Sequence, residues 1–348
     1  MKFSTILSLG LPALALAAPI TKRCDEHVAA LNGTIPSTTA PSTIAPTAVP
    51  TGGSSGPASL EDVASTGYAT QNGGTSGGKG GKTIEVSTLE QLTAAVAGDE
   101  AAIVLITGPI SGTGNVKVGS NKSVIGKDSS VKLSGFTITV KAVKNVILRN
   151  FAVSKVVGGD AIAINLAENV WADHLDLSSD RDHDKDFYDG LLDVTHAGDF
   201  VTISNTYMHD HWKASLVGHS DSNGAEDTGH LRVTYNNNYF QNINSRGPSL
   251  RFGTGHLYNN YYENVSDGIN TRQGAQVLVE NNVFVNSKKP LYATDKGFAV
   301  ARGNDFGGIT VADLGGSLTS VPYTGYTLLE AAAVKAAVVG TAGNTLSF

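Results

Sequence analysis

The chain has 348 residues, enough for one large domain or two small ones, and its formal net charge is −6. An acidic balance of this kind argues against nucleic acid as a partner. Cys24 is the single cysteine, so an internal disulfide is excluded, and stability must come from a large core and many backbone hydrogen bonds.

The N-terminal residues have the pattern of a secretory signal. Lys2 supplies a positive charge, an apolar run covers residues 6–16, and Ala17 and Ala18 are the small residues that precede a cleavage site. The apolar run is too short for a membrane-spanning helix. We therefore expect a signal peptide over 1–18 and a secreted, extracellular protein with no membrane partner.

A composition change near residue 60 predicts a domain boundary. Residues 33–59 are rich in Pro, Ser, Thr and Gly, and such a stretch cannot bury enough apolar surface to fold. The pair Lys22-Arg23 suits either a second processing site or two ordinary surface charges. We expect a propeptide and linker over 19–59 and one folded domain over 60–348. Sequons for N-glycosylation occur at Asn32, Asn121 and Asn264.

Two short helices are predicted, one near each end of the folded domain. The sequence Ser87-Thr88-Leu89-Glu90 is a capping box, which predicts a helix directly after it. The sequence Thr327-Leu328-Leu329-Glu330 predicts the start of a second helix, and Gly340 is its expected stop. We expect each helix to cap one end of the fold, which favours a monomer.

Between these helices, seven segments repeat a strand of alternating polar and apolar residues with a polar residue near its middle. A period of 22 to 32 residues predicts a solenoid, and the β-branched and aromatic composition favours strands over helical repeats. We predict an all-β parallel β-helix rather than an antiparallel sandwich, with a recurring Asn that bonds its equivalent in the next coil. The repeated residues are Asn150, His174, Asn205, Asn237, Asn260, Asn282 and Asn304.

Two of the intervals between these residues are longer than the rest, and their extra residues predict loops that carry the binding site. The first long interval holds an acidic cluster, and Asp160 lies one coil earlier. Oxygen ligands from neighbouring coils suit Ca²⁺, and the alternative is a solvated acidic loop. The acidic cluster contains Asp180, Asp182, Asp184, Asp186, Asp189 and Asp193.

Basic residues follow the acidic cluster in the next coils. Lys213 lies in the second long interval, and Arg246 and Arg251 flank a Gly-Pro turn one coil later. This order predicts a mixed cluster of carboxylates and cations, which suits a polyanionic sugar. His209 and His211 lack a clear third ligand, so we interpret them as hydrogen-bonding residues rather than a zinc site.

Several longer motifs give the chain a specific resemblance. The segments NVWADHLDLS (169–178), DGLLDVTHAGDFVTISN (189–205), DHWKASLVGHSD (210–221) and RGPSLR (246–251) are the most distinctive. In this order and spacing they resemble the fungal form of the pectate lyases, polysaccharide lyase family 1, and the resemblance extends from about residue 60 to the end. It implies a right-handed parallel β-helix, Ca²⁺ as cofactor, and polygalacturonate (pectate) of plant cell walls as the partner.

The resemblance also implies roles for individual residues. A further Asp is common in the family where this chain has Gly158, which implies a calcium site that substrate completes. Asp173 and His174 match another family motif, and we interpret them as structural. Carried over residue by residue, the calcium ligands fall on Asp160, Asp189 and Asp193, the substrate-binding residues on Lys213 and Arg251, and the catalytic base on Arg246.

The implied reaction is β-elimination. Calcium would neutralise the uronate carboxylate beside the C5 proton, Arg246 would remove that proton, and the C4–O bond would break to leave a 4,5-unsaturated end. Since a guanidinium has an ordinary pKa above about 12, this role implies an alkaline optimum. The alternatives are a calcium-independent pectin lyase, a polygalacturonase-like hydrolase with paired catalytic carboxylates, and a non-catalytic binding module.

Overall fold

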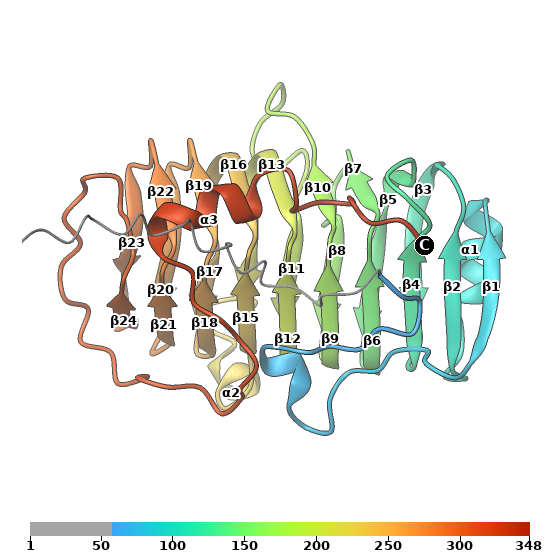
Figure 1. Ribbon diagram of the computed structural model, residues 1–348, viewed down its shortest axis with the longest axis horizontal. Coiled ribbons are helices and arrows are strands. Elements are labelled where there is room, and N and C mark those ends of the chain that lie inside the picture. The colour runs from blue at the N-terminus through green and yellow to red at the C-terminus, as the bar shows by residue number, and fades with distance from the viewer. Residues whose placement is uncertain (1–57) are drawn as a thin grey trace, which may run out of the picture. The chain divides into compact units, whose positions relative to one another are not determined.

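The computed structural model describes residues 58–348. The interpretations that concern the signal peptide, the dibasic pair, Cys24 and Asn32 lie outside the described residues. Within the described part, the chain winds into a stack of coils whose neighbouring strands run parallel (Figure 1). This arrangement confirms the predicted parallel β-helix and contradicts the antiparallel sandwich.

One face of the stack is a ten-stranded parallel sheet, and each of its strands comes from a successive coil. In spatial order its strands are β1 (Lys82–Val86), β2 (Ala102–Ile106), β4 (Lys122–Gly126), β6 (Lys144–Arg149), β9 (Glu168–Asp173), β12 (Asp199–Ser204), β15 (Arg232–Asn236), β18 (Thr254–Tyr258), β21 (Gln276–Glu280) and β24 (Phe298–Arg302).

Two further faces meet at the long strand β5 (Lys132–Lys141), which pairs with one face through its first half and with the other through its second half. The first of these faces contains β7 (Ala152–Ser154), β10 (Asp176–Ser178), β13 (Tyr207–Lys213), β16 (Tyr239–Ser245), β19 (Tyr261–Glu263) and β22 (Val283–Val285). The second contains β8 (Ile162–Asn165), β11 (Leu192–Thr195), β14 (Leu216–Val217), β17 (Ser249–Arg251), β20 (Asp267–Arg272) and β23 (Lys289–Ala293), and β3 (Ile110–Val118) pairs with β5.

The interior is one continuous apolar core that runs the length of the stack, from Val86 to Ala299. Equivalent residues of successive coils lie one strand spacing apart, about 4.8 Å, so like side chains stack directly. The ring centroids of Phe240 and Tyr262 are 4.7 Å apart, and those of Tyr262 and Phe284 are 4.1 Å apart. The repeat therefore builds its core coil by coil, without a disulfide.

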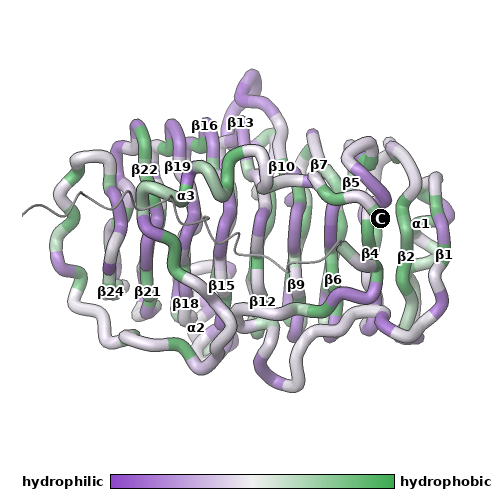
Figure 2. The backbone as a smooth tube through the Cα atoms, viewed as in Figure 1, coloured by the Kyte–Doolittle hydropathy of each residue, from purple (hydrophilic) through white to green (hydrophobic). Residues whose placement is uncertain are grey.

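The outer side of the ten-stranded sheet is partly covered as well. Figure 2 shows that β2 is hydrophobic along its length, whereas β15 carries hydrophilic residues. The outward-facing residues Ile103, Leu105 and Ile125 form a small second cluster under Leu60 and Phe348, which come from the two ends of the described chain. The segments beside the repeat therefore cover its first coils.

The turn after the ten-stranded sheet explains the recurring Asn. In six coils the residue directly after the strand has a left-handed backbone, with φ between 48° and 60°: Asn150, His174, Asn205, Asn237, Asn259 and Asn281. Asn tolerates this conformation better than most residues. In the coils of Asn237, Asn259 and Asn281, the next residue belongs to a separate buried ladder, in which the Asn260 amide donates to Asn282 Oδ1 at 2.8 Å.

This ladder confirms the predicted bonding between coils, but the predicted repeat mixed the two positions. Its first four residues are left-handed residues, whereas Asn260, Asn282 and Asn304 are ladder residues one position further on. The equivalents of Asn237 are therefore Asn259 and Asn281. Both positions favour Asn for different physical reasons, so the residue type alone does not separate them.

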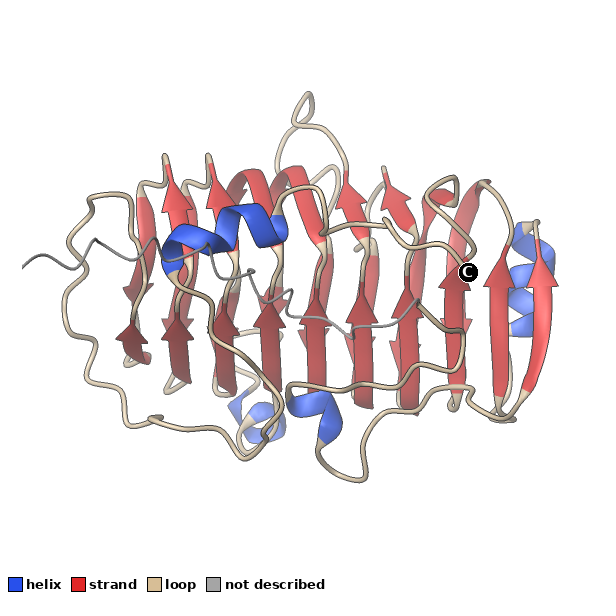
Figure 3. Cartoon of the chain, in the orientation of Figure 1, coloured by secondary structure: helices blue, strands red, loops and turns tan. Residues whose placement is uncertain are grey.

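The helices are short and lie outside the coils of the stack (Figure 3). The helix α1 (Leu89–Ala95) caps the first coils, and its N-cap Thr88 accepts the backbone N–H of Gln91 at 3.2 Å, so the capping box begins one residue later than predicted. Two other helical turns are η1 (Tyr68–Thr70) and α2 (Gly224–Asp227). No helix in residues 58–348 is long and apolar enough to cross a membrane.

The second predicted helix is α3 (Ala331–Val338), which begins later than expected and ends before Gly340. It lies along the side of the stack, against β19 and β22, rather than over an end. Its buried residues Val334 and Val338 belong to a cluster with Tyr239 and Tyr261. The last coil is instead covered by the segment with Phe306, Val311 and Leu314, which pack against the core.

Candidate active site

The candidate site residues come from four consecutive coils and gather along one edge of the stack. Asp160 directly precedes β8, Asp193 lies in β11, and Lys213 ends β13. The register between β13 and β16 places Lys213 beside Ser245, so Arg246 follows one coil later. The predicted order, with carboxylates first and cations in the next coils, matches the order of these residues in the fold.

Asp160 and Asp193 converge on one glycine. The backbone N–H of Gly190 donates to Asp160 Oδ1 at 2.8 Å, and that of Leu216 donates to Asp193 Oδ1 at 2.9 Å. A Cβ atom on Gly190 would lie 2.8 Å from Asp160 Oδ1 and 2.5 Å from Asp193 Oδ1. Only glycine leaves room for both carboxylate oxygens here.

This carboxylate pair lacks sufficient positive charge around it. Burial raises the pKa of Asp160 to about 6, although the hydrogen bond from Gly190 opposes the shift. Burial also raises the pKa of Asp193 well above its ordinary value, and the neighbouring charge of Asp160 adds to the shift. Arg246 lowers both values without cancelling the effect of burial. The two carboxylates would therefore be stabilised by a bound cation.

Asp189, the third candidate ligand, is paired with a candidate substrate-binding residue. Lys213 Nζ lies 2.8 Å from Asp189 Oδ1 and 3.2 Å from Asp186 Oδ1. The Lys213 side chain is 11% exposed, and that of Asp189 is 53% exposed. Burial lowers the pKa of Lys213, but its hydrogen bonds to these carboxylates outweigh burial and give a net rise.

Because Asp189 pairs with Lys213, the three aspartates do not form a ready-made cluster. Across residues 58–348, no group of three acidic, histidine or cysteine side chains has the arrangement of a metal site. The donor set nevertheless consists of oxygens only, which suits a hard cation such as Ca²⁺. The glycine between Asp160 and Asp193 also keeps their oxygens close together.

His211 connects the acidic loop to the strand that carries Lys213. It is buried, and its Nε2–H donates to the backbone carbonyl of Asp189 at 2.7 Å. Its Nδ1 bonds Ser179 Oγ, so the loop from 179 to 189 is held near both ends. His209, on the same strand, bonds Asp176 and Asp210. The interpretation of both histidines as hydrogen-bonding residues is confirmed.

Arg246 differs from Lys213 and Arg251 in the contacts of its side chain. Its backbone has a left-handed conformation, with φ 60°, and its carbonyl accepts the N–H of Ser215 at 2.8 Å. None of the side-chain hydrogen bonds or ion pairs found among the described residues involves its guanidinium. Its electrostatic effect on Asp160, Asp193 and Lys213 shows that it lies close to all three.

Arg251 is held by a carboxylate that sequence reasoning did not identify. Its Nε donates to Asp221, and its Nη1 donates to the Gly218 carbonyl at 3.0 Å. Arg272, the register partner of Arg251 in the next coil, donates to both oxygens of the same Asp221 at 2.9 and 2.7 Å. Asp221 and Arg272 were not predicted as site residues, although the repeat places Arg272 one coil after Arg251.

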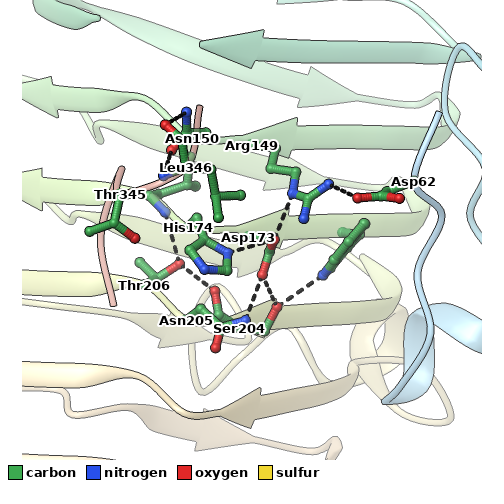
Figure 4. Close-up of polar contacts among 12 residues, drawn as sticks. Asp62, Arg149, Asn150, Asp173, His174, Ser204, Asn205, Thr206, Thr345 and Leu346 are labelled. Carbon is green, nitrogen blue, oxygen red and sulfur yellow. Dashed lines mark hydrogen bonds and ion pairs between the residues drawn. The ribbon is translucent and has the colours of Figure 1, made fainter. Parts of the chain in front are cut away.

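A second polar cluster surrounds Asp173 on the ten-stranded sheet (Figure 4). Asp173 Oδ2 accepts from Arg149 Nε and contacts His174 Nδ1, both at 2.8 Å, and Oδ1 accepts from Ser204 at 2.7 Å and Asn205 at 2.8 Å. Burial alone would raise the pKa of Asp173, but these partners hold it below its ordinary value. These contacts join three coils, in agreement with the structural interpretation of Asp173 and His174.

Comparison with known proteins gives a consistent result. The family described as pectate lyase matches residues 55–345. Probable pectate lyase A of Aspergillus flavus is 63% identical over 294 residues, covering 84% of this chain and 91% of that protein. Probable pectate lyase A of Aspergillus fumigatus is 57% identical over 352 residues, with full coverage of both chains (100% each).

A solved structure agrees with these relatives. A pectate lyase from a Bacillus species, in complex with trigalacturonate, is 30% identical, covers 80% of this chain and 98% of that chain, and has a TM-score of 0.73. The fold and these similarities place the chain among the polysaccharide lyases. It belongs to the pectate lyase family, and the Aspergillus relatives confirm the resemblance to the fungal form.

Proposed function

We propose that the protein is a secreted, calcium-dependent pectate lyase that cleaves the (1→4)-α-D-galacturonan of plant cell walls by β-elimination. The observation that carries the proposal is the convergence of Asp160 and Asp193 on Gly190, with Lys213 and Arg246 beside them. The half-buried carboxylate of Asp160 and the buried carboxylate of Asp193 are short of positive charge, which supports a cation site, and the adjacent cations support a polymer of acidic sugars.

Asp160, Asp189 and Asp193 would hold the calcium ion. When bound, calcium supplies the positive charge that neutralises a uronate carboxylate and makes the adjacent C5 proton more acidic. Asp189 is the adaptable member of the set, because its carboxylate is half exposed and now pairs with Lys213. With Gly158 in place of a further carboxylate, the protein offers few oxygens, and the substrate would supply others.

The cations of the site would position the polymer and remove the proton. Lys213 and Arg251 would bind uronate carboxylates through charge-assisted hydrogen bonds. Arg246, in the neutral guanidine form that alkaline pH favours, would take the C5 proton. The C5–H electron pair would form the C4–C5 double bond as the C4–O bond breaks, and the leaving oxygen would take a proton from solvent water. Among residues 58–348 no hydrogen bond or ion pair involves the Arg246 guanidinium, so this group is available to the substrate, which supports the role.

The same observations favour this reaction over its alternatives. A pectin lyase acts on a methyl ester, which has no charge to neutralise, so it would have no use for the Asp160–Asp193 pair. Membership of a lyase family disfavours a hydrolase. The signal pattern over residues 1–18 supports secretion. The helix α1 packs against β1, β2 and β3, and Phe306, Val311 and Leu314 pack against the core at the last coil, which supports a monomer.

One assay tests the proposal. The protein is incubated with polygalacturonate or with highly esterified pectin, in calcium or in a chelator, and the ultraviolet absorbance of the unsaturated product is followed. We expect absorbance on polygalacturonate that the chelator abolishes. New reducing ends without absorbance would show hydrolysis, and equal activity in the chelator on esterified pectin would show a pectin lyase. Either result would overturn the proposal.

A further inference from the structure

Arg251 and Arg272 share a single carboxylate from the protein itself. Asp221 accepts from the Nε of Arg251 with one oxygen and from Nη2 of Arg272 with both oxygens. Two guanidinium groups stacked in adjacent coils repel each other, so a carboxylate between them is stabilising. The geometry is the one in which such a pair would bind the carboxylate of a uronate residue.

Asp221 is held in place by its loop. Gly218, at the start of this loop, lies so close to Arg251 that a Cβ atom would be 2.8 Å from the Arg251 Cβ, and its carbonyl accepts from Arg251. At the other end of the loop, buried Asp227 accepts the backbone N–H groups of Ala197 and His219. Asp221 itself lies at the surface, and its carboxylate is held by hydrogen bonds from Arg251 and Arg272.

The charges around the two arginines cancel. Asp295 Oδ2 lies 3.7 Å from Arg272, so two guanidinium groups face two carboxylates. The side chains of Arg251 and Arg272 are 12% and 24% exposed, whereas that of Asp221 is 48% exposed. A sugar that approaches from solvent meets the carboxylate of Asp221 as well as the arginine edges. A uronate carboxylate can still accept hydrogen bonds from Arg251, but the charge of Asp221 offsets much of the attraction of the arginine pair.

We propose that Asp221 is a specificity-determining residue, which neutralises the Arg251–Arg272 pair so that this subsite accepts a methyl-esterified galacturonate residue almost as well as a charged one. The inference rests on the proposed function, because it concerns which form of the same polymer is bound. Lys213, one coil nearer to the candidate calcium site, also pairs with carboxylates, those of Asp186 and Asp189, but Asp189 is a candidate calcium ligand. Tolerance for the ester is therefore assigned to the Arg251 side, where Asp221 is not a candidate ligand.

The substitution Asp221→Asn separates charge from shape. Asparagine keeps a side-chain oxygen that can accept from Arg251, but it leaves the two arginines with a net positive charge. A charged uronate then gains one favourable interaction, which at a half-exposed site corresponds to about a two- to fivefold effect. A methyl ester gains nothing from the added charge. The variant is therefore expected to prefer the charged polymer more strongly.

The measurement is the ratio of kcat/KM on fully de-esterified polygalacturonate to kcat/KM on half-esterified pectin. This ratio is independent of the folded fraction, since both substrates meet the same amount of active enzyme. Glu226→Gln is the matched control, because it removes the same charge from the same loop, where Glu226 bonds His196 and Asn223 instead. We expect the ratio to rise about two- to fivefold in Asp221→Asn, through KM, and to stay unchanged in the control.

The other outcomes overturn the inference in distinguishable ways. If the wild-type protein releases no unsaturated product from either polymer, the proposed function fails and the inference fails with it. If the wild-type protein is active but Asp221→Asn leaves the ratio unchanged or lowers it, Asp221 only orients the arginines, and the proposed function stands without this inference. An equal rise in Glu226→Gln would show a general effect of net charge and would contradict a specific role for Asp221.

Discussion

Two buried aspartates of this molecule, Asp173 and Asp193, are in opposite electrostatic situations. Asp173 accepts from Arg149, Ser204 and Asn205 and contacts His174, and its pKa lies below the ordinary value. Burial and a neighbouring carboxylate raise the pKa of Asp193 instead. Both residues lie on strands of the same stack, and both were noted from motifs in the sequence.

The comparison of Asp173 with Asp193 distinguishes a carboxylate that joins coils from a carboxylate that is suited to bind a ligand. Every partner that Asp173 needs comes from the protein, so its contacts stabilise the fold. The Asp160–Asp193 pair is destabilised until something outside the protein supplies charge, which is the condition expected of a binding site.

Arg246→Lys should reduce kcat on polygalacturonate by about 10³-fold, the usual contribution of a positioned general base. The stability of the folded protein should change little, because the guanidinium has no hydrogen-bond partner among the described side chains. The measurement is steady-state ultraviolet absorbance, with thermal unfolding of the same samples. Arg302→Lys, at the last strand of the ten-stranded sheet, is the control. Full activity in the folded Arg246→Lys variant would exclude Arg246 as the base.

Asp173→Asn should lower the free energy of unfolding by about 3 kcal/mol, because it removes the buried carboxylate that pairs with Arg149 and contacts His174, and leaves Arg149 with only the more exposed carboxylate of Asp62. Urea unfolding at neutral pH measures the effect. Asp62→Asn is the control, because it removes the more exposed carboxylate that also contacts Arg149 and should cost less. A change of less than about 1 kcal/mol in Asp173→Asn would contradict the structural role.

The pH dependence of this effect has a defined sign. The folded-state pKa of Asp173 lies below its unfolded value of about 4, so the carboxylate stabilises the folded protein at higher pH. This stabilisation is complete above the unfolded pKa and is lost as the pH falls toward the folded pKa. The difference in stability between wild type and Asp173→Asn should therefore shrink below about pH 4. A difference that grows on acidification would contradict the assignment.

Gly158→Asp should tighten calcium binding in the absence of substrate by about tenfold, since added carboxylate charge strengthens such sites. The structure leaves open space beside Gly158, but its φ of +70° imposes a cost of about 1 kcal/mol on any other residue. Gly158→Ala carries the same backbone cost without the ligand and is the control. Calorimetric titration measures both. Equal affinities in the two variants would show that position 158 does not face the ion.

The repeat allowed the fold to be predicted from the sequence. The pairing of side chains between coils could not be predicted in this way. Alternating strands and recurring Asn indicate coils, but Asn suits both the left-handed position of Asn259 and the ladder position of Asn260. Their separation required the register between strands. The second helix was predicted near its true place, yet the apolar face that turns α3 onto β19 and β22 depends on residues far away in the sequence.

For the candidate site, too, one part could be predicted from the sequence and another part could not. The order of the acidic and basic motifs along the chain was enough to predict that Asp160, Asp193 and Lys213 share one edge. This order did not predict that Lys213 would pair with Asp189, or that Asp221 would pair with Arg251 of the following coil. These contacts depend on how two loops fold over the strands, and loops carry no periodic signal.

Calcium-dependent thermal unfolding of the wild-type protein and Asp193→Asn distinguishes a carboxylate that binds calcium from one that stabilises the fold. Asparagine keeps an oxygen for the Leu216 N–H but removes one of the two repelling charges. In calcium at 100 times its Kd, the wild type should gain about 2.7 kcal/mol and melt at a higher temperature. Asp193→Asn should show little calcium effect, and without calcium it should be at least as stable as the wild type. An equal calcium shift in both proteins, or a loss of stability in Asp193→Asn like that expected for Asp173→Asn, would contradict the account.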